Sequence, residues 1–446
     1  MGDKRGGMGT AGQLDIAVVG SGISGLSAAW LLAKRHKVTL YEASDWIGGH
    51  SHTVEALGVP VDTGFIVYNE ATYPNLTALF AHLEVATRAT SMSFAVSLDE
   101  GRLEYAGGTR GGLFAQRRNL ASPRFWAMLR DLRRFYRAAP RDLPTMGSLG
   151  LGDYLDGLGC GSAFRDDHLY PMAAAIWSTP VCAIPDYPAA AFVRFCENHG
   201  LLKLKQRPQW RTVTGGSREY VGRLLADFAG EVRTSCPVRS VRRDASGVSL
   251  ETARGPARHD RVVIAAHADA ALALLRDADA DERRVLSAFR YRRNQAVLHS
   301  DSTLMPRRRR VWSSWNYAAR ERGAGLAPSV TYWMNRLQHL PEDKPLFVTL
   351  NPLREPDPAL VHWRGEYDHP VLDGPASAAQ AELWALQGRR HAWFCGAHFG
   401  AGFHEDGLQA GLAVAEQLGR LRRPWSVADE SGRIRLAAAD RVAEAA

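Results

Sequence analysis

The first regular pattern in the chain is an apolar run at residues 15–19, which ends in glycine and leads into apolar positions at helical spacing. Leu26, Ala29 and Ala33 recur at intervals of three and four residues, which predicts a helix. A second run rich in β-branched residues follows at 37–42. A strand, a helix and a second strand in this order predict a β-α-β unit.

Two later regions have the pattern of a different sheet. Residues 87–105 alternate apolar and polar positions around a turn at 99–101, which is typical of an antiparallel hairpin. Residues 329–334 and 346–350 have the composition of half-buried strands. We therefore expect an antiparallel sheet in addition to the β-α-β unit.

Strand-rich sequence returns at 232–251, residues 261–266 form an apolar run typical of a buried parallel strand, and 392–418 predict a strand, a glycine-rich loop and a helix. The predicted fold class is α/β, with a discontinuous Rossmann-type dinucleotide-binding domain and an inserted α+β cap domain that contains the antiparallel sheet. We expect the nucleotide domain at 14–80, 215–288 and 388–422, the cap or substrate domain at 81–214 and 289–387, and loosely held tails at 1–13 and 424–446.

Composition supports a two-domain globular protein. The chain has 446 residues, of which 46% are hydrophobic and 23% charged. It contains no uninterrupted apolar run long enough to span a bilayer, and no apolar segment follows the first basic residues, so we expect a cytoplasmic protein.

The cysteines are five in number and widely spaced, without a C-x-x-C pair. This pattern predicts reduced thiols and no metal site. Cys395 has two readings, a core thiol or a covalent anchor for a cofactor, and the first is favoured.

A net charge of +8 favours an anionic partner, which the sign alone leaves open among nucleic acid, an anionic membrane surface and an acidic substrate. No nucleic-acid-binding motif accompanies the charge, so we expect no nucleic acid partner. Residues 124–137 place apolar side chains at helical spacing among arginines, with Trp126 beside them. Such a helix fits either a lipid interface or ordinary packing within the cap. The arginine run at 307–310 is typical of a solvated loop.

A dinucleotide fingerprint lies between the first strand and the first helix. Gly22 lets backbone amides approach a pyrophosphate at the start of the helix, and an acidic residue 22 positions after the first glycine can accept hydrogen bonds from ribose hydroxyls. The predicted binding residues here are Gly20, Ser21, Gly22, Ser24, Gly25, Glu42 and Ala43.

The glycine doublet Gly48-Gly49 follows Glu42 closely. In this the chain resembles the flavin amine oxidase superfamily, which includes monoamine oxidases, protoporphyrinogen oxidase and phytoene desaturases. The resemblance implies that FAD is the cofactor and that the doublet lies against it, where a Cβ would collide. The family usually has arginine next, whereas this chain has His50, which can still donate to a phosphate or ribityl oxygen.

The resemblance continues in three further places, at residues 61–65, 236–238 and 394–408. It implies that these stretches also contact FAD. The family has aspartate where this chain has alanine in the last motif, so one carboxylate beside the flavin is missing. The additional binding residues implied are Gly64, Phe65, Val238, Gly396, Ala397, Gly407 and Leu408.

Residues 64–69, 312–317 and 402–407 resemble more closely a bacterial branch of amine-oxidase-like flavoproteins associated with cyclopropane-synthase-like lipid methyltransferases. One of these is similar to the fatty acyl desaturase of furan fatty acid formation. The resemblance implies a FAD-dependent oxidoreductase that is peripheral on the inner membrane and desaturates a phospholipid acyl chain by hydride transfer to flavin N5. A methylated unsaturated chain would give a conjugated diene. Because only one dinucleotide fingerprint is present, oxygen or an electron carrier is the expected acceptor, and a homodimer is one option for assembly.

Four side chains near the predicted flavin are candidates for the catalytic base, and each has the alternative of shaping a loop. They are His52, His398, His404 and Glu405. Two other functions stay open, an amine oxidase acting on a soluble amine and a flavin-binding partner protein without turnover. Reduction of the flavin by lipid, by amine or by neither would separate the three.

Overall fold

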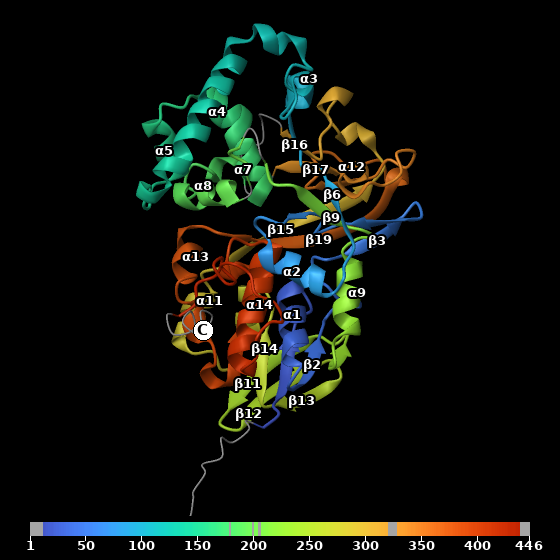
Figure 1. Cartoon of the computed structure of the whole chain (residues 1–446), viewed down its shortest axis with the longest axis vertical. Helices are drawn as coiled ribbons and strands as arrows, with labels where there is room; N and C mark the ends of the chain where they lie inside the picture. The colour runs from blue at the N-terminus through green and yellow to red at the C-terminus, as the bar shows by residue number, and fades with distance from the viewer. Residues whose placement is uncertain (1–11, 178–179, 199, 204–206, 320–327, 438–446) are drawn as a thin grey trace, which may run out of the picture.

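The computed structural model describes residues 12–177, 180–198, 200–203, 207–319 and 328–437. Figure 1 shows two lobes, with the long strands β15 (Arg290–His299) and β19 (Val361–Val371) lying between them. Most of the predicted N-terminal tail, residues 1–11, lies outside the described ranges.

A parallel sheet of five strands forms the centre of the lower lobe. β1 (Asp15–Val19) pairs with β2 (Lys37–Tyr41) on one side and with β14 (Arg261–Ile264) on the other. The edges are β10 (Glu231–Arg233) and β20 (Ala392–Phe394). The side chains of β1, β14 and β20 are almost all buried, as expected when both faces of a parallel sheet are covered, whereas β10 is an exposed edge.

Helices cover one face of this sheet and an antiparallel sheet covers the other. α1 (Ile23–Leu32) packs against α14 (His404–Gly419), and a Cβ added at Gly411 would lie 2.1 Å from the carbonyl oxygen of Ser24. This backbone contact requires glycine. The opposite layer consists of β11 (Val238–Asp244), β12 (Gly247–Thr252) and β13 (Gly255–His259), which contact β1 and β14.

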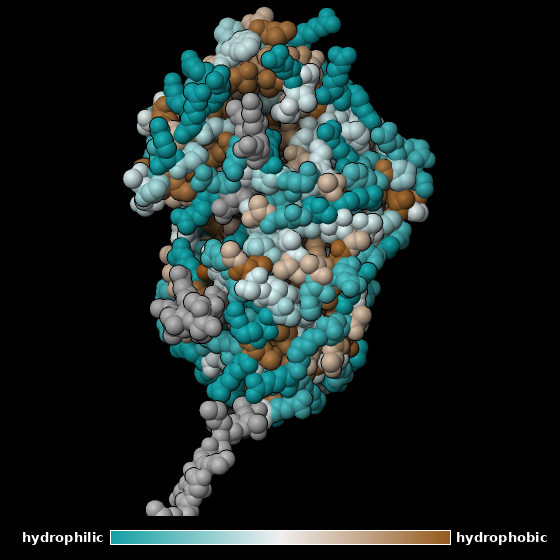
Figure 2. Space-filling model, viewed as in Figure 1, coloured by the Kyte–Doolittle hydropathy of each residue, from teal (hydrophilic) through white to brown (hydrophobic). Residues whose placement is uncertain are grey.

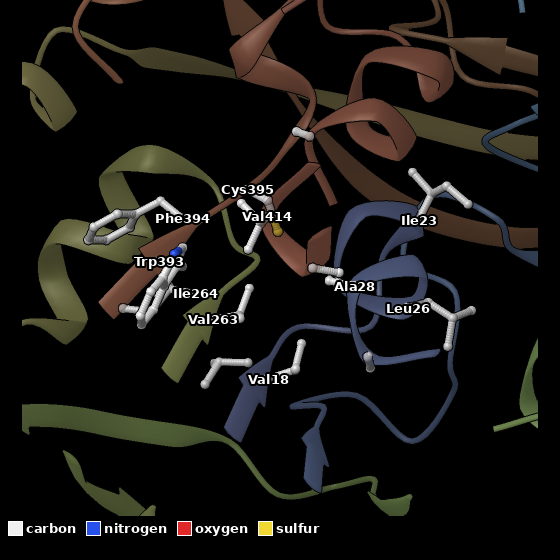
Figure 3. Packing of buried hydrophobic residues seen from close by; sticks show 14 of the residues in the cluster. Val18, Ile23, Leu26, Ala28, Val263, Ile264, Trp393, Phe394, Cys395 and Val414 are labelled. Carbon is white, nitrogen blue, oxygen red and sulfur yellow. The ribbon is translucent and has the colours of Figure 1, made fainter. Parts of the chain in front are cut away.

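Cys395 follows β20 and is fully buried in the core of this lobe. Figure 3 shows it beside Val414 of α14. Burial raises the pKa of its thiol to about 12, so the thiol is protonated and acts as a packing group. The structure therefore supports the core reading of this cysteine.

The second large sheet has seven strands in the order β19-β15-β18-β17-β16-β7-β8. All its pairs are antiparallel except β16 with β7, which corrects the expectation of a purely antiparallel sheet. The hairpin predicted around residues 99–101 is confirmed as β7 and β8. The bounds of the strands not yet given are β7 (Phe94–Leu98), β8 (Leu103–Ala106), β16 (Trp315–Ala319), β17 (Ser329–Trp333) and β18 (Phe347–Leu350).

A layer of helices packs on this sheet in the upper lobe and has its own buried cluster, centred on Phe135, Phe164 and Phe192. The helices are α3 (Arg110–Leu113), α4 (Pro123–Asp142), α5 (Leu151–Gly157), α6 (Ser162–Phe164), α7 (Tyr170–Trp177) and α8 (Ala189–Asn198). The sequence predicted only the helix that became α4.

Smaller elements connect the two lobes. Two minor sheets are β3 (Thr53–Ala56) with β4 (Val59–Asp62), and β5 (Tyr68–Asn69) with β9 (Trp210–Val213) and β6 (Thr87–Thr90). The remaining α-helices of the described residues are α2 (Pro74–His82), α9 (Arg218–Ala226), α10 (Ala268–Leu274), α11 (Ala280–Leu286), α12 (Met334–Gln338) and α13 (Gly374–Ala379).

The largest buried cluster includes residues from three separate parts of the chain, between 16 and 85, 213 and 289, and 376 and 436. The last part extends beyond the predicted boundary at 422. Ile434 and Leu436 are buried, and the Arg433 guanidinium lies 2.6 Å from the Asp406 carboxylate. The prediction of a loose tail is therefore wrong for residues 424–437, and residues 438–446 lie outside the described ranges.

Candidate functional site

The fingerprint loop leaves open space at the start of α1. A Cβ added at Gly20 would lie 2.4 Å from the carbonyl oxygen of Ala265, and one at Gly25 would lie 1.9 Å from the carbonyl oxygen of Gly20. Gly22 is half-buried, and a Cβ there would meet no atom within 4 Å. Gly22 is also the N-cap of α1, without a side-chain cap. The start of α1 is thus open beside Gly22, where the fingerprint predicts that the amides of the first turn bind a pyrophosphate.

Glu42 lies at the end of β2 beside this loop. Its carboxylate accepts hydrogen bonds from the Ser21 amide at 2.9 Å, the Ser21 hydroxyl at 2.6 Å and the Ser44 amide at 2.8 Å. The backbone of Glu42 also accepts the Cys236 amide, which brings the start of β11 and Val238 into the same region. The carboxylate is held in place by these donors and is half-buried, with capacity left for ribose hydroxyls.

The glycine doublet lies directly against the fingerprint loop. The Gly48 amide donates to the Ser21 hydroxyl at 3.3 Å, and a Cβ at Gly49 would lie 3.0 Å from the Cα of Gly22. Gly49 has a φ of +57°, a conformation that favours glycine. The Phe65 amide donates to the carbonyl of His50 at 2.7 Å, so residues 64–65 run beside the doublet.

The C-terminal motif reaches the same place. Gly396 and Ala397 follow β20, and Ala397 lies close to Gly407 in the first turn of α14. A Cβ at Gly407 would lie 3.0 Å from the side chain of Ile23, at the start of α1. Leu408 is fully buried in this contact. The structure therefore brings the first, second and last motifs together, and their residues remain the predicted FAD contacts.

Imidazole and phenol rings line the side of this region that faces the seven-stranded sheet. The His50 ring lies 4.9 Å from that of Tyr367, 6.0 Å from that of His369 and 6.4 Å from that of His267. Burial, together with the neighbouring histidines, lowers the pKa of His50 to about 3 and that of His369 to about 4. These rings are neutral at physiological pH.

His404 is the first residue of α14 and is held on two sides. Its ring stacks on Phe65 with centroids 3.8 Å apart, and its Nε2 lies 2.7 Å from the Tyr220 hydroxyl. The Tyr220 hydroxyl in turn lies 2.5 Å from the Ser51 hydroxyl. Burial lowers the pKa of His404 to about 3. The residue is half-buried and stays partly accessible.

The other histidine candidates lie nearby. His398 is buried in the turn before α14 against Phe289, and its Nε2 has no hydrogen-bond partner among the described residues. His52 contacts the Thr63 hydroxyl at 3.1 Å and packs near Trp363. Both histidines remain predicted candidates for the catalytic base.

The catalytic candidate Glu405 is held in contacts that join two helices. One carboxylate oxygen accepts the Asn75 amide at 3.0 Å and the other accepts the Leu76 amide at 2.9 Å. Asn75 and Gln409 side chains donate to it as well. The carboxylate is fully buried at the N-terminus of α2, where it satisfies free helix amides, so it joins α14 to α2.

Sequence reasoning missed Ser51, Tyr220, Tyr367 and His369. The only signal for Ser51 was its place after the glycine doublet. The others lie on α9 and β19, far away in the sequence, and no motif identifies them. Within the described ranges, no group of three histidine, cysteine or acidic side chains is arranged to hold a metal ion.

The chain belongs to the family described as flavin containing amine oxidoreductase, whose model matches residues 23–344. The motifs at α1, the glycine doublet and α14 fit a dinucleotide, and FAD is the cofactor. A Mycobacterium tuberculosis protein that carries the name flavin-containing monoamine oxidase AofH is 27% identical over 270 residues. The match spans 56% of this chain and 56% of that protein, so the chain matches about half the length of this relative.

Solved structures share the whole fold at low identity. A redesigned putrescine oxidase has a TM-score of 0.68 and 15% identity, over 91% of this chain and 99% of that one. A fatty acid isomerase from P. acnes that produces CLA has a TM-score of 0.63 and 15% identity, over 91% and 98%. These values confirm the α/β fold with parallel and antiparallel sheets.

Proposed function

We propose that this chain is a FAD-dependent oxidoreductase that desaturates a fatty acyl chain of a membrane phospholipid, a methylated unsaturated chain being one such substrate. The observation that carries the proposal is the neutral lining beside the glycine doublet. His50, His369 and Tyr367 present uncharged rings there. An ammonium group would exchange its hydration for uncharged rings in this place, whereas an acyl chain has no such hydration to lose.

The likeness to a fatty acid isomerase supports the same choice, because it shows that the fold accommodates an acyl substrate in another protein. The fold alone does not distinguish acyl chains from amines, since putrescine oxidase shares it as well. The lining therefore carries the argument, and the net charge of +8 agrees with an anionic lipid rather than a cationic amine.

Desaturation removes two hydrogens from adjacent carbons and forms one carbon-carbon double bond. When bound, FAD supplies the hydride acceptor at N5 and is reoxidised by oxygen or an electron carrier. The second hydrogen leaves as a proton. His404 is the residue best placed to accept it, because it is partly accessible and hydrogen-bonded to Tyr220.

The test is anaerobic reduction of the flavin-loaded protein. Phospholipids with methylated unsaturated acyl chains should bleach the flavin absorbance, and mass spectrometry should find a product lighter by two hydrogens. Saturated phospholipids serve as the matched control. Bleaching by putrescine or a monoamine, with none by lipid, would contradict the proposal.

The second candidate is an amine oxidase acting on a soluble amine. It is favoured by the name of the Mycobacterium tuberculosis relative and by the fold of putrescine oxidase. The same bleaching experiment decides between the two, because it includes both substrates. A protein that binds FAD and is bleached by neither would instead be a flavin-binding partner without turnover.

A further inference from the structure

The exposed face of α4 carries a row of arginines along most of the helix. Its inner face buries Phe125, Met128 and Phe135 against the cap. The outward-facing residues are Trp126, Arg130, Arg133, Arg134, Arg137 and Arg141, which we call the arginine face. An amphipathic helix that packs through one side thus presents a strongly basic opposite side.

A shallow groove runs along this face. Its volume is about 900 Å³, and Leu129, Leu132 and Leu158 contribute apolar surface between the arginines. At one end Trp126 is 49% exposed and Leu120 is 54% exposed, with the indole N–H donating to the Leu120 carbonyl at 2.9 Å. Large apolar side chains are thus accessible directly beside the cationic groups.

The positive charge of the face is only partly neutralised. Arg130 and Arg134 share the buried carboxylate of Asp131, and Arg141 lies 4.0 Å from Asp142. Arg133 and Arg137 have no acidic partner among the residues that the structure describes. The face therefore keeps a net positive charge on long side chains that can reach outward.

The arginine face lies far from the nucleotide lobe. Figure 1 shows α4 in the upper lobe and the sheet β11–β13 at the opposite end of the molecule. Figure 2 shows hydrophobic residues among hydrophilic ones over the end that α3 and α4 occupy. None of the helices in the described residues has the length and hydrophobicity of a membrane-spanning segment.

We propose that the arginine face of α4 docks this protein on an anionic phospholipid surface. Arginines would bind the phosphate groups, while Trp126, Leu120 and the leucines of the groove enter the interface between headgroups and acyl chains. An acidic protein or a nucleic acid would satisfy the arginines but would leave the apolar groove exposed. The combination of the two kinds of side chain favours lipid.

The test is sedimentation of the flavin-loaded full chain with vesicles. We expect binding to vesicles of phosphatidylcholine mixed with phosphatidylglycerol, weak binding to phosphatidylcholine alone, and a decrease as salt is added. The double variant Arg133→Gln, Arg137→Gln should lower the partition coefficient about 25-fold, since each basic residue near an anionic surface contributes roughly 1 kcal/mol.

The matched control is Arg239→Gln with Arg242→Gln, which removes the same charge from exposed positions on β11. It should leave vesicle binding within about twofold of the parent protein, because these residues lie at the other end of the molecule. Flavin absorbance and thermal melting verify that both variants fold. Equal loss in both double variants would overturn the proposal.

The variant Trp126→Ala tests the apolar part separately. It should weaken binding to anionic vesicles while the salt dependence stays unchanged, since no charge is removed. Unchanged binding would mean that the apolar residues do not enter the interface, and the assignment to lipid would fail. Vesicle binding requires no turnover, so its outcome is independent of whether the proposed desaturation is correct.

Discussion

Gly22 is the N-cap of α1 and Gly25 lies in its first turn, but a methyl group added to each would have opposite consequences. At Gly22 it would enter open space, and the φ of −61° suits any residue. We predict that Gly22→Ala folds with a loss of stability below about 1 kcal/mol but binds FAD at least about tenfold more weakly, because the methyl group occupies the place predicted for the pyrophosphate. Titration of the apoprotein with FAD measures the affinity.

Gly25→Ala is the matched comparison. Its Cβ would lie 1.9 Å from the carbonyl oxygen of Gly20, so the helix must move away from the strand. We expect a loss of about 1–3 kcal/mol in the free energy of unfolding, measured by urea denaturation of the apoprotein. If both variants lost stability equally and bound FAD alike, the space beside Gly22 would not be a phosphate site.

A second prediction at the residue scale concerns His404. Replacing it with alanine should slow the anaerobic reduction of the flavin by the proposed lipid substrate about 100-fold, the usual effect of losing a general base. His404→Phe keeps a ring to stack on Phe65 but removes both nitrogens. It should be as slow as the alanine variant.

Tyr220→Phe removes only the hydroxyl that contacts Nε2 of His404, so an intermediate rate is expected. The flavin content of all three variants provides the control for binding. A normal rate in His404→Phe would leave the histidine with a packing role alone.

At the scale of elements, the C-terminal segment is attached to α14 by an ion pair. The Asp406 carboxylate is fully buried in the first turn of α14, and Arg433 reaches it at 2.6 Å. Asp406 also accepts the Phe403 amide at 2.7 Å. We predict that Arg433→Gln costs about 3 kcal/mol of stability, because it leaves a buried charge unpaired.

Adding Asp406→Asn to Arg433→Gln removes the unpaired charge and should recover part of the loss. Chemical denaturation of the four proteins in this cycle measures the coupling. Independent effects of the two substitutions would show that the segment is held by Ile434 and Leu436 alone.

The elements that sequence predicted well are those with an unambiguous local pattern. The strands at 15–19 and 261–264 are apolar throughout because both faces are buried, and the hairpin around 99–101 has alternating positions and a turn. The glycine motifs were predictable because their spacing between a strand and a helix is typical of a dinucleotide-binding turn. Their convergence could be inferred only through the resemblance to a family.

The elements that sequence missed depend on distant partners. Helices α5 to α8 are short, and their stability comes from a shared core around Phe164 and Phe192 rather than from local pattern. The composition of residues 424–437 predicts a loose tail, but Arg433 contacts a buried carboxylate 27 positions away. In the sequence, Glu405 is an acidic residue near the flavin motif. Its hydrogen bonds to α2 depend on residues about 330 positions away, so no local pattern predicts them.

At the scale of the whole molecule, several histidines are neutral because the fold buries them. Burial is the main cause for each, and it lowers the pKa of His50, His398 and His404 to about 3 and that of His369 to about 4. In the unfolded chain these groups return to about 6.5. Between these pH values the unfolded state binds more protons than the folded state, so stability rises with pH and is lost on acidification below about 6.5.

We therefore predict that the free energy of unfolding decreases as pH falls from about 6.5 toward 4, with each such histidine contributing up to about 1.4 kcal/mol per pH unit. His398→Phe should reduce this slope, because its Nε2 is buried without a partner in the described part of the chain. The exposed His339, changed to glutamine, is the control and should leave the slope unchanged. Urea denaturation of the apoprotein across this range measures all three, and a flat profile in the parent protein would mean that these imidazoles take up protons in the folded state, which would also weaken the argument for an uncharged substrate.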